Sequence, residues 1–211
     1  MNYRMGIDLG GTKIEGIVLD PQGRELFRKR VDTERDQGYP HILNRLKAVH
    51  DELAAAIAGA PHTFGIGTPG VVSPKTGLLK NSNTVCMNAQ PVKADLEKLL
   101  NRRIAIQNDA NCFAMAEALL GAGRGKKLVF GVIMGTGCGG GIVYNGEVIT
   151  GPQGIAGEWG HMSINPEGPL CYCGHRGCVE SYISGGGLQN RYAEQFGVEK
   201  SFRDIEKDYL A

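Results

Sequence analysis

Three strand-like segments separated by tight-turn residues open the chain. Residues 3–9 and 14–20 are largely apolar, and residues 25–31 follow the second turn with the length of a strand. Gly10-Gly11 separates the first pair and Pro21-Gln22-Gly23-Arg24 separates the second, so both connections are short enough for hairpins. The pattern predicts three adjacent antiparallel strands.

Helical periodicity begins at Pro40. Apolar residues from Ile42 to Leu53 recur at intervals of three and four, which predicts a helix over residues 40–58 with one buried face. Strand-like and helix-like segments then alternate. This order predicts an α/β fold in which helices cover the faces of a mixed sheet. The expected segments are strands at 63–67 and 104–107, helices at 91–101 and 110–120, and a hairpin formed by 128–134 and 141–144.

A run of small residues, Gly121-Ala122-Gly123-Arg124-Gly125, predicts a boundary between domains at residues 1–121 and 122–211. The two parts also echo each other. When the sequence is shifted by 125 residues, residues 6–12 align with residues 131–137, and both copies read as strand, glycine-rich turn and strand. Two related domains would explain this echo, and chance similarity between two apolar hairpins is the alternative.

Charge and hydropathy narrow the class of protein. The 211 residues carry 23 basic and 22 acidic side chains that are mixed along the sequence, so no basic stripe indicates nucleic acid. No apolar run approaches the roughly 20 residues needed to span a membrane, and the N-terminus does not read as a secretion leader. We therefore expect a cytoplasmic protein that binds neither nucleic acid nor membranes.

Two glycine-rich stretches have the residues of phosphate-binding turns. Asp8-Leu9-Gly10-Gly11-Thr12-Lys13 combines backbone N–H groups with a hydroxyl and an ammonium, and Asp8 could hold Mg²⁺. Gly135-Thr136-Gly137-Cys138-Gly139-Gly140-Gly141 is the second stretch. Either one alone could be an ordinary tight turn. Neither matches a P-loop or a dinucleotide-binding motif, which disfavours those folds.

Four residues in the last third have the chemistry of a zinc site. His161, Cys171, Cys173 and Cys178 make a Cys₃His set, which is enough for a closed tetrahedral structural Zn²⁺ site. A disulfide with a free thiol, or unligated cysteines, are the alternatives. Glu158 and Glu180 flank this set, so a bound ion would bring two carboxylates to neighbouring positions where they could accept hydrogen bonds from sugar hydroxyls.

Asp109 lies between an apolar strand and a helix, in Asn108-Asp109-Ala110-Asn111. Its position alone favours a helix N-cap over a general base that accepts the proton of an attacking hydroxyl. Asn83 lies in an irregular loop, where its amide suits a sugar hydroxyl, although asparagine is also ordinary in loops.

Taken together, these motifs resemble the ROK sugar kinases of the actin-like ATPase superfamily, whose fold is a two-domain, ribonuclease H-like α/β architecture. The resemblance rests on the stretches above, on Gly67-Thr68-Pro69-Gly70 and Glu158-Trp159-Gly160-His161, and on the Cys-x-Cys-Gly-x-x-Gly-Cys-x-Glu run ending at Glu180. It implies that Asp109 is the catalytic base, not a cap. It further implies sugar contacts for Asn83, Asn108, Glu158, His161 and Glu180. It implies contacts to the ATP phosphates for Asp8, Gly10, Gly11, Thr12 and Gly137. Lys13, Gly135 and Thr136 are the remaining nucleotide-binding candidates of the two glycine-rich turns.

The resemblance implies a hexose and ATP as substrates, Mg²⁺ as cofactor and Zn²⁺ as structural ion, and it is compatible with a homodimer. The segments 70–74, 80–84 and 88–91 are similar to the fructokinase or mannokinase branch, so fructose is the expected substrate, with N-acetylglucosamine and glucose as alternatives. Family members continue beyond residue 211, so we expect a truncated second domain and an incomplete nucleotide pocket. A non-catalytic sugar-binding fragment or sensor is the competing function; a purely structural zinc module would not explain the two turns.

Overall fold

The computed structural model describes residues 2–210, which form two compact units. The first comprises the chain as far as Cys112 together with Pro152–Gly154, and the second comprises Phe113–Gly151 and the chain from Ile155 onward. The division falls inside helix α3 (Asp109–Leu119), ahead of the glycine run 121–125 that the sequence suggested as a boundary. The two compact units are defined by contacts within the structure and say nothing of whether the two parts are related. The boundary between two related domains therefore stays a prediction.

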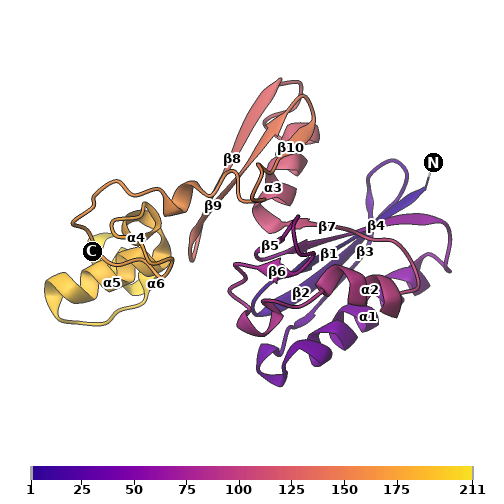
Figure 1. The fold of residues 1–211 in the computed structure, drawn as a ribbon, viewed down its shortest axis with the longest axis horizontal. Coiled ribbons are helices and arrows are strands. Elements are labelled where there is room, and N and C mark those ends of the chain that lie inside the picture. The colour runs from indigo at the N-terminus through magenta and orange to yellow at the C-terminus, as the bar shows by residue number, and fades with distance from the viewer. Residues whose placement is uncertain (1, 211) are drawn as a thin grey trace. The chain divides into compact units, whose positions relative to one another are not determined.

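A five-stranded mixed sheet forms the centre of the first unit (Figure 1). Its strand order is β3-β2-β1-β4-β7, in which β1, β2 and β3 are antiparallel neighbours and β4 and β7 continue the sheet in parallel with β1. The antiparallel start that the turns predicted is therefore confirmed. The strands are β1 (Tyr3–Leu9), β2 (Lys13–Leu19), β3 (Glu25–Asp32), β4 (His62–Thr68) and β7 (Ala105–Asn108).

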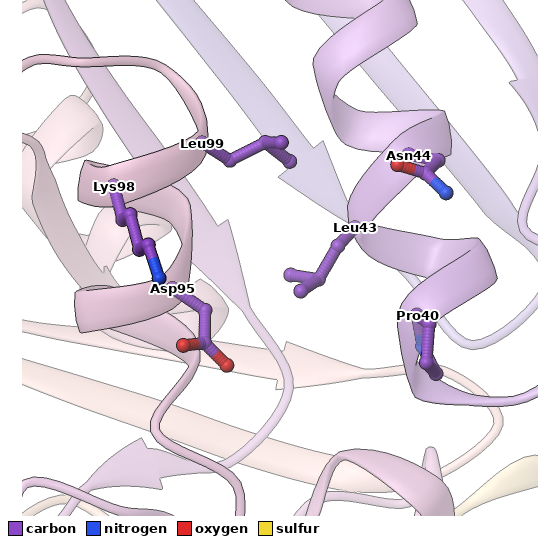
Figure 2. A pocket seen from close by; sticks show the side chains of 6 residues that line it. All are labelled: Pro40, Leu43, Asn44, Asp95, Lys98 and Leu99. Carbon is purple, nitrogen blue, oxygen red and sulfur yellow. The ribbon is translucent and has the colours of Figure 1, made fainter.

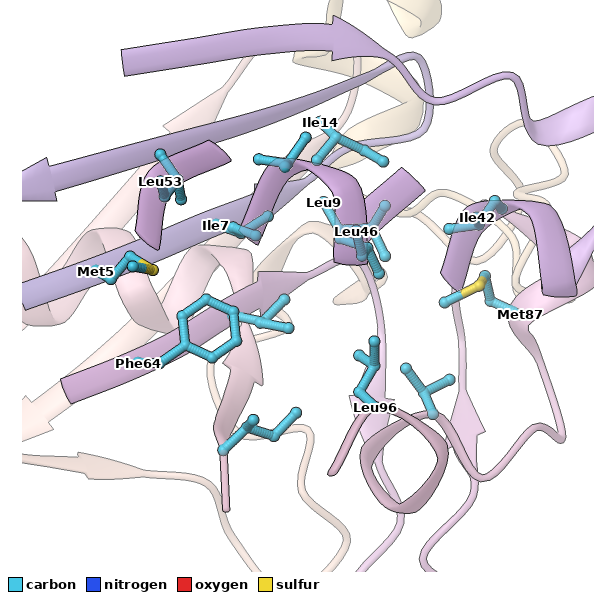
Figure 3. Close-up of a cluster of buried hydrophobic side chains, with 14 of the residues drawn as sticks. Met5, Ile7, Leu9, Ile14, Ile42, Leu46, Leu53, Phe64, Met87 and Leu96 are labelled. Carbon is cyan, nitrogen blue, oxygen red and sulfur yellow. The ribbon is translucent and has the colours of Figure 1, made fainter. Parts of the chain in front are cut away.

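Helices α1 (Tyr39–Ala56) and α2 (Val92–Leu99) lie on one face of this sheet (Figure 1). Alternate side chains of β1, namely Met5, Ile7 and Leu9, are buried on that face, as the two-residue period of a strand requires. Leu46 and Leu53 meet them from α1, and Figure 3 shows these side chains gathered in one cluster. The apolar stripe of residues 40–58 is thus the side of α1 that packs on the sheet.

We expect Leu46→Ala to destabilise the first unit strongly. Leu46 is 1% exposed at the centre of the cluster, so its truncation leaves a cavity and costs about 2–5 kcal/mol of unfolding free energy. Chemical denaturation would measure this loss. Leu26→Ala is the matched control, because Leu26 is 51% exposed and its truncation should cost less than about 0.5 kcal/mol. Equal losses in the two variants would contradict this placement of the core.

Short elements connect the parallel strands of the first unit. Strands β5 (Val71–Val72) and β6 (Leu79–Lys80) pair as a small hairpin after β4, and a 3₁₀ turn spans Val85–Met87. Another 3₁₀ turn, Arg35–Gln37, precedes α1. Within residues 2–210, no helix combines the length and the apolar content that a membrane span requires.

The second unit contains a three-stranded sheet of order β10-β9-β8, the larger part of α3, and the helices α4, α5 and α6. The residues of α3 pack on β8, where a side chain at Gly131 would lie 2.8 Å from the Cβ of Ala114. The strands are β8 (Leu128–Met134), β9 (Cys138–Tyr144) and β10 (Glu147–Ile149), and a 3₁₀ turn covers Trp159–His161. The helices after the cysteine-rich segment are α4 (Glu180–Ile183), α5 (Gly185–Phe196) and α6 (Phe202–Leu210).

The internal echo reappears in the strand boundaries. Shifting β1 and β2 by 125 residues gives the bounds of β8 and β9. The pairing differs by one residue, because Leu9 faces Ile14 in the first hairpin whereas Met134 faces Cys138 in the second. Duplication would account for these matching bounds, and the one-residue difference lies in the turns, which are the segments with the candidate phosphate chemistry.

Candidate functional site

Two carboxylates of the first unit lie at the carboxyl ends of neighbouring parallel strands. Asp8 of β1 pairs in register with Gly67 of β4, and the next strand, β7, leads directly into Asp109. A Cβ on Gly67 would lie 3.6 Å from Asp8 Oδ1 and 3.9 Å from the Asp109 Cα. Glycine at position 67 therefore keeps the space between the two aspartates free of a side chain.

Asp109 does not cap helix α3. That role belongs to Asn108, whose Oδ1 accepts a hydrogen bond from the Asn111 backbone N at 3.1 Å. The Oδ1 atom of Asp109 accepts instead from Asn108 Nδ2 and from the Ala110 backbone N, each at 2.9 Å. The buried amide of Asn108 thus fixes the helix start and orients the carboxylate of its neighbour. Its predicted contact with a sugar stays a prediction.

Both aspartates have raised pKa values. Burial is the main cause for Asp109, and hydrogen bonds from Ala110, from its own backbone and from Asn108 lower the pKa only in part. Burial is also the main cause for Asp8, to which the negative charges of Asp109 and Glu15 add and which Arg30 opposes. Repulsion between two neighbouring carboxylates is what a divalent cation relieves, so these residues fit a Mg²⁺ ion.

The turn between β1 and β2 has a fixed backbone. The Gly10 N–H donates to the carbonyl of Lys13 at 2.8 Å and closes the hairpin. Thr33 then binds two carbonyls of the turn, with its Oγ1 on Gly10 and its N–H on Thr12. Lys13, expected to add a donor for phosphate, is paired with Asp32 on the surface, in an exposed ion pair that costs little to break.

Asn83 and an unpredicted cation lie beside the same turn. Asn83 Oδ1 lies 3.4 Å, and Arg35 Nη1 lies 3.9 Å, from the position that a Cβ on Gly11 would occupy. The exposed side chain of Arg35 comes from the 3₁₀ turn before α1 and belongs to none of the recognised motifs. Its basic charge was the only sequence signal for it, and such a signal is too common to single out one arginine.

In the second unit, only the first part of the long glycine stretch is a turn. Gly135, Thr136 and Gly137 connect β8 to β9, whereas residues 138–141 belong to strand β9. The prediction of one turn over 135–141 was therefore too long. The glycines of β9 serve packing: the Trp159 indole N–H donates to the Gly139 carbonyl at 2.7 Å, and a Cβ on Gly140 would lie 2.7 Å from the Trp159 ring.

The four predicted zinc ligands come together. One ligand atom from each of His161, Cys171, Cys173 and Cys178 lies within 4.8 Å of all the others. His161 Nδ1 is 3.6 Å from Cys171 Sγ, and the sulfurs of Cys173 and Cys178 are also 3.6 Å apart. All six cysteines are free thiols, so the disulfide alternative is not what the structure has. Sulfurs held on one tetrahedral zinc ion would lie about 3.8 Å apart, so the set fits Zn²⁺.

His161 has a neighbour on each ring nitrogen. Nδ1 faces the thiols, and Nε2 lies 3.0 Å from the hydroxyl of Tyr172. Burial raises the pKa of that hydroxyl to about 12, and the negative charges of Glu180 and Glu158 contribute to the shift. The expectation that the cysteine-rich segment brings these two glutamates near each other stays a prediction.

Glu180 has a partner that the sequence did not suggest. Its Oε2 accepts a hydrogen bond at 2.7 Å from the backbone N of Cys138, the first residue after the turn at 135–137. One carboxylate oxygen of this predicted sugar ligand is thus occupied by the backbone next to a predicted phosphate turn.

A hollow of about 400 Å³ lies between α1 and α2 (Figure 2). Pro40, Leu43 and Asn44 line it from α1, and Asp95, Lys98 and Leu99 line it from α2. None of these residues belongs to the predicted site, and the site residues of the first unit lie instead at the carboxyl ends of the strands.

A mixed sheet with flanking helices, with aspartates at its strand ends and glycine-rich hairpin turns, is the construction of the actin-like ATPase sugar kinases. The chain belongs to the ROK family, whose sequence profile matches residues 4–208. It is thus an ATP-dependent sugar kinase by family, as the motifs predicted.

Known proteins support this assignment. An N-acetyl-D-glucosamine kinase of Yersinia pestis is 39% identical over 98% of this chain and 84% of its own length. An N-acetylgalactosamine kinase of a Shewanella species is 42% identical, over 91% of this chain and 64% of its own length. Among solved structures, a ROK hexokinase from Thermus thermophilus matches with a TM-score of 0.87 and 31% identity, over 99% of this chain and 69% of that one.

Proposed function

We propose that this protein transfers the γ-phosphate of ATP to a hydroxyl of an N-acetylated hexosamine, with N-acetylglucosamine as its substrate. The proposal of catalysis rests on the placement of Asp109. Asp109 and Asp8 both lie next to Gly67. Asn108 donates a hydrogen bond to the Asp109 carboxylate and itself caps the helix.

Asp109 is the general base in this proposal. Phosphoryl transfer needs a group that orients the attacking hydroxyl and accepts its proton, and an accessible carboxylate with a raised pKa is suited to that task. Asp8 would hold Mg²⁺, and the backbone of the turns at 10–12 and 135–137 would face the phosphates. Asn83 and Arg35 border the first of these turns and are further candidates for ligand contact.

The substrate class rests on the relatives. Kinases named for N-acetylglucosamine and N-acetylgalactosamine share 39% and 42% identity with this chain. The fructose preference suggested by residues 70–74, 80–84 and 88–91 finds no support among these named relatives, which favour the alternative of an N-acetylated sugar. His161, Glu158 and the second oxygen of Glu180 are the proposed sugar contacts in the second unit.

Zn²⁺ is the proposed ion of the cluster. Three thiols and an imidazole fill its tetrahedral shell, so it would stabilise the loop between His161 and Cys178 and would hold no water for catalysis.

An assay that couples ADP release to a colour change tests the proposal with a panel of sugars. N-acetylglucosamine should give the highest kcat/KM, ahead of N-acetylgalactosamine, N-acetylmannosamine, glucose, mannose and fructose. Turnover with fructose alone would contradict this substrate and favour a fructokinase. Sugar binding without turnover for any member of the panel would favour the non-catalytic sensor.

The pH dependence of kcat/KM should report Asp109. Because burial raises the pKa of this carboxyl above its ordinary value of 3.8, the acidic limb of the profile should have its midpoint above 3.8. The base must be ionised to accept a proton, so activity falls as the pH decreases through that midpoint. A pH–rate profile measured with saturating Mg²⁺ provides the check. An acidic midpoint at or below 3.8 would assign the titration to an exposed carboxylate elsewhere.

A further inference from the structure

The contact between Glu180 and Cys138 links two motifs of the second unit that are far apart in the sequence. The segment at 180–186 makes three hydrogen bonds to the turn at 135–137 and to the residue that follows it. Glu180 Oε2 accepts from the Cys138 N–H at 2.7 Å, the Gly185 N–H donates to the Gly135 carbonyl at 2.8 Å, and the Gly186 N–H donates to the Thr136 carbonyl at 3.3 Å.

The glycines on both sides of this contact leave little room for a side chain. A Cβ on Gly137 would lie 2.6 Å from Glu180 Oε2, so a larger residue there would displace the carboxylate. A Cβ on Gly185 would lie 3.2 Å from the Gly135 carbonyl oxygen. The Gly185-Gly186-Gly187 run, which no sequence motif explained, lets the start of α5 approach the turn, and the hydroxyl of Ser184 caps that helix by accepting from the Gly187 N–H at 2.9 Å.

The other end of this connection is the cysteine–histidine cluster. Cys178 is one of its four ligand residues, and its carbonyl accepts a hydrogen bond from the Ser181 N–H at 2.9 Å in the first turn of α4. The Val179 N–H donates to the Met162 carbonyl at 3.0 Å, next to the cluster residue His161. The backbone on both sides of the cluster therefore fixes where the Glu180 side chain begins.

We propose that Glu180 is a positioning residue for the turn at 135–137, through which the cysteine–histidine cluster sets the geometry of nucleotide binding. This inference rests on the proposed function, in which that turn faces the ATP phosphates. It gives the two oxygens of Glu180 different tasks: Oε2 holds the backbone of the turn, and Oε1 is left for the sugar.

Three substitutions separate positioning from sugar binding. Glu180→Gln keeps a carbonyl oxygen that can accept the Cys138 N–H. Glu180→Ala removes the acceptor, and Glu180→Asp keeps the charge on a side chain one methylene too short to reach. Glu194→Ala is the matched control, because Glu194 is an exposed residue of α5 in the same unit.

The first readout is the affinity for the Mg²⁺ complex of adenylyl imidodiphosphate, measured by calorimetry with no sugar present. Loss of a hydrogen bond to a charged acceptor should raise the Kd roughly 10- to 100-fold in the Ala variant. The Kd of the Asp variant should also rise. The Gln variant should stay within roughly fivefold of the wild type, and the Glu194 control should be unchanged. Equal losses in Gln and Ala, or an unchanged Kd in Ala and Asp, would overturn the inference.

The second readout needs no ligand. Amide hydrogen exchange of the peptide covering residues 134–138 should accelerate in the Ala and Asp variants and stay near the wild-type rate in Gln. If the wild-type chain binds no nucleotide, which an incomplete nucleotide pocket would explain, exchange alone decides whether Glu180 holds the turn. If the Ala variant does not fold, the Gln and Asp pair provides the same comparison. Unchanged exchange in Asp would refute the positioning role.

Discussion

Asp109→Asn should reduce kcat by about 10²–10⁴-fold while leaving the Kd for the sugar nearly unchanged. The amide oxygen of asparagine can still accept the hydrogen bond from the Ala110 N–H, so the start of α3 should remain intact. An amide cannot accept the proton of the attacking hydroxyl, so the loss falls on the chemical step. Steady-state kinetics and calorimetric sugar titration measure the two quantities separately.

Asp51→Asn is the matched control for this experiment. Asp51 lies on α1, is half-exposed and forms a surface ion pair with Lys47, so the kcat of this variant should equal that of the wild type. If turnover of the Asp109 variant also stayed within about twofold, the base would have to be another group. Asp8, on the opposite side of Gly67, would then be the next candidate.

Removal of the metal should cost the second unit much of its stability. We expect one zinc ion per chain, and a chelator or Cys173→Ser should release it because a serine hydroxyl is a poor ligand for Zn²⁺. Zinc present at about 1,000 times its Kd contributes about 4 kcal/mol, which corresponds to a decrease in Tm on the order of 10 °C for a protein of this size. Metal analysis and thermal unfolding provide the measurements.

Removal of the metal should also change the affinity for the sugar. Loss of the ion should weaken hexose affinity, because Glu158 and Glu180, two of the proposed sugar contacts, flank the cluster residues His161 and Cys178 in the sequence. Cys86→Ser is the control, since Cys86 belongs to the first unit and lies outside the cluster. A protein that retains its Tm and its sugar affinity without zinc would show that the cysteines have no structural task.

The sequence predicted a functional site most clearly where several ligand residues lie within a short stretch. His161, Cys171, Cys173 and Cys178 could be assigned to one site because the ligand preferences of Zn²⁺ are strict and the loops between them are short. Asp109 shows the opposite case. Its position before a helix favoured a cap, and the structure gives the cap to Asn108, because which of two adjacent side chains turns back to the helix depends on local dihedral angles.

The glycine stretch at 135–141 shows a further limit. Glycine is needed both where a turn bends and where a bulky side chain packs against the backbone, so the residue type alone cannot distinguish the two uses. The structure separates them: residues 135–137 form the turn, and Gly139 and Gly140 receive Trp159.

By itself, the sequence determined the order of the main strands and helices as far as residue 144, the covered face of α1, the family and the set of candidate ligands, because these depend on local periodicity and on motifs of adjacent residues. Only the tertiary structure decided which distant groups meet. Asp8 and Asp109 face each other across Gly67 because β1, β4 and β7 are parallel neighbours, and Glu180 reaches Cys138 because α4 and α5 pack on the β8–β9 turn. Such contacts arise from strand register and packing between segments many residues apart, and no local pattern encodes them.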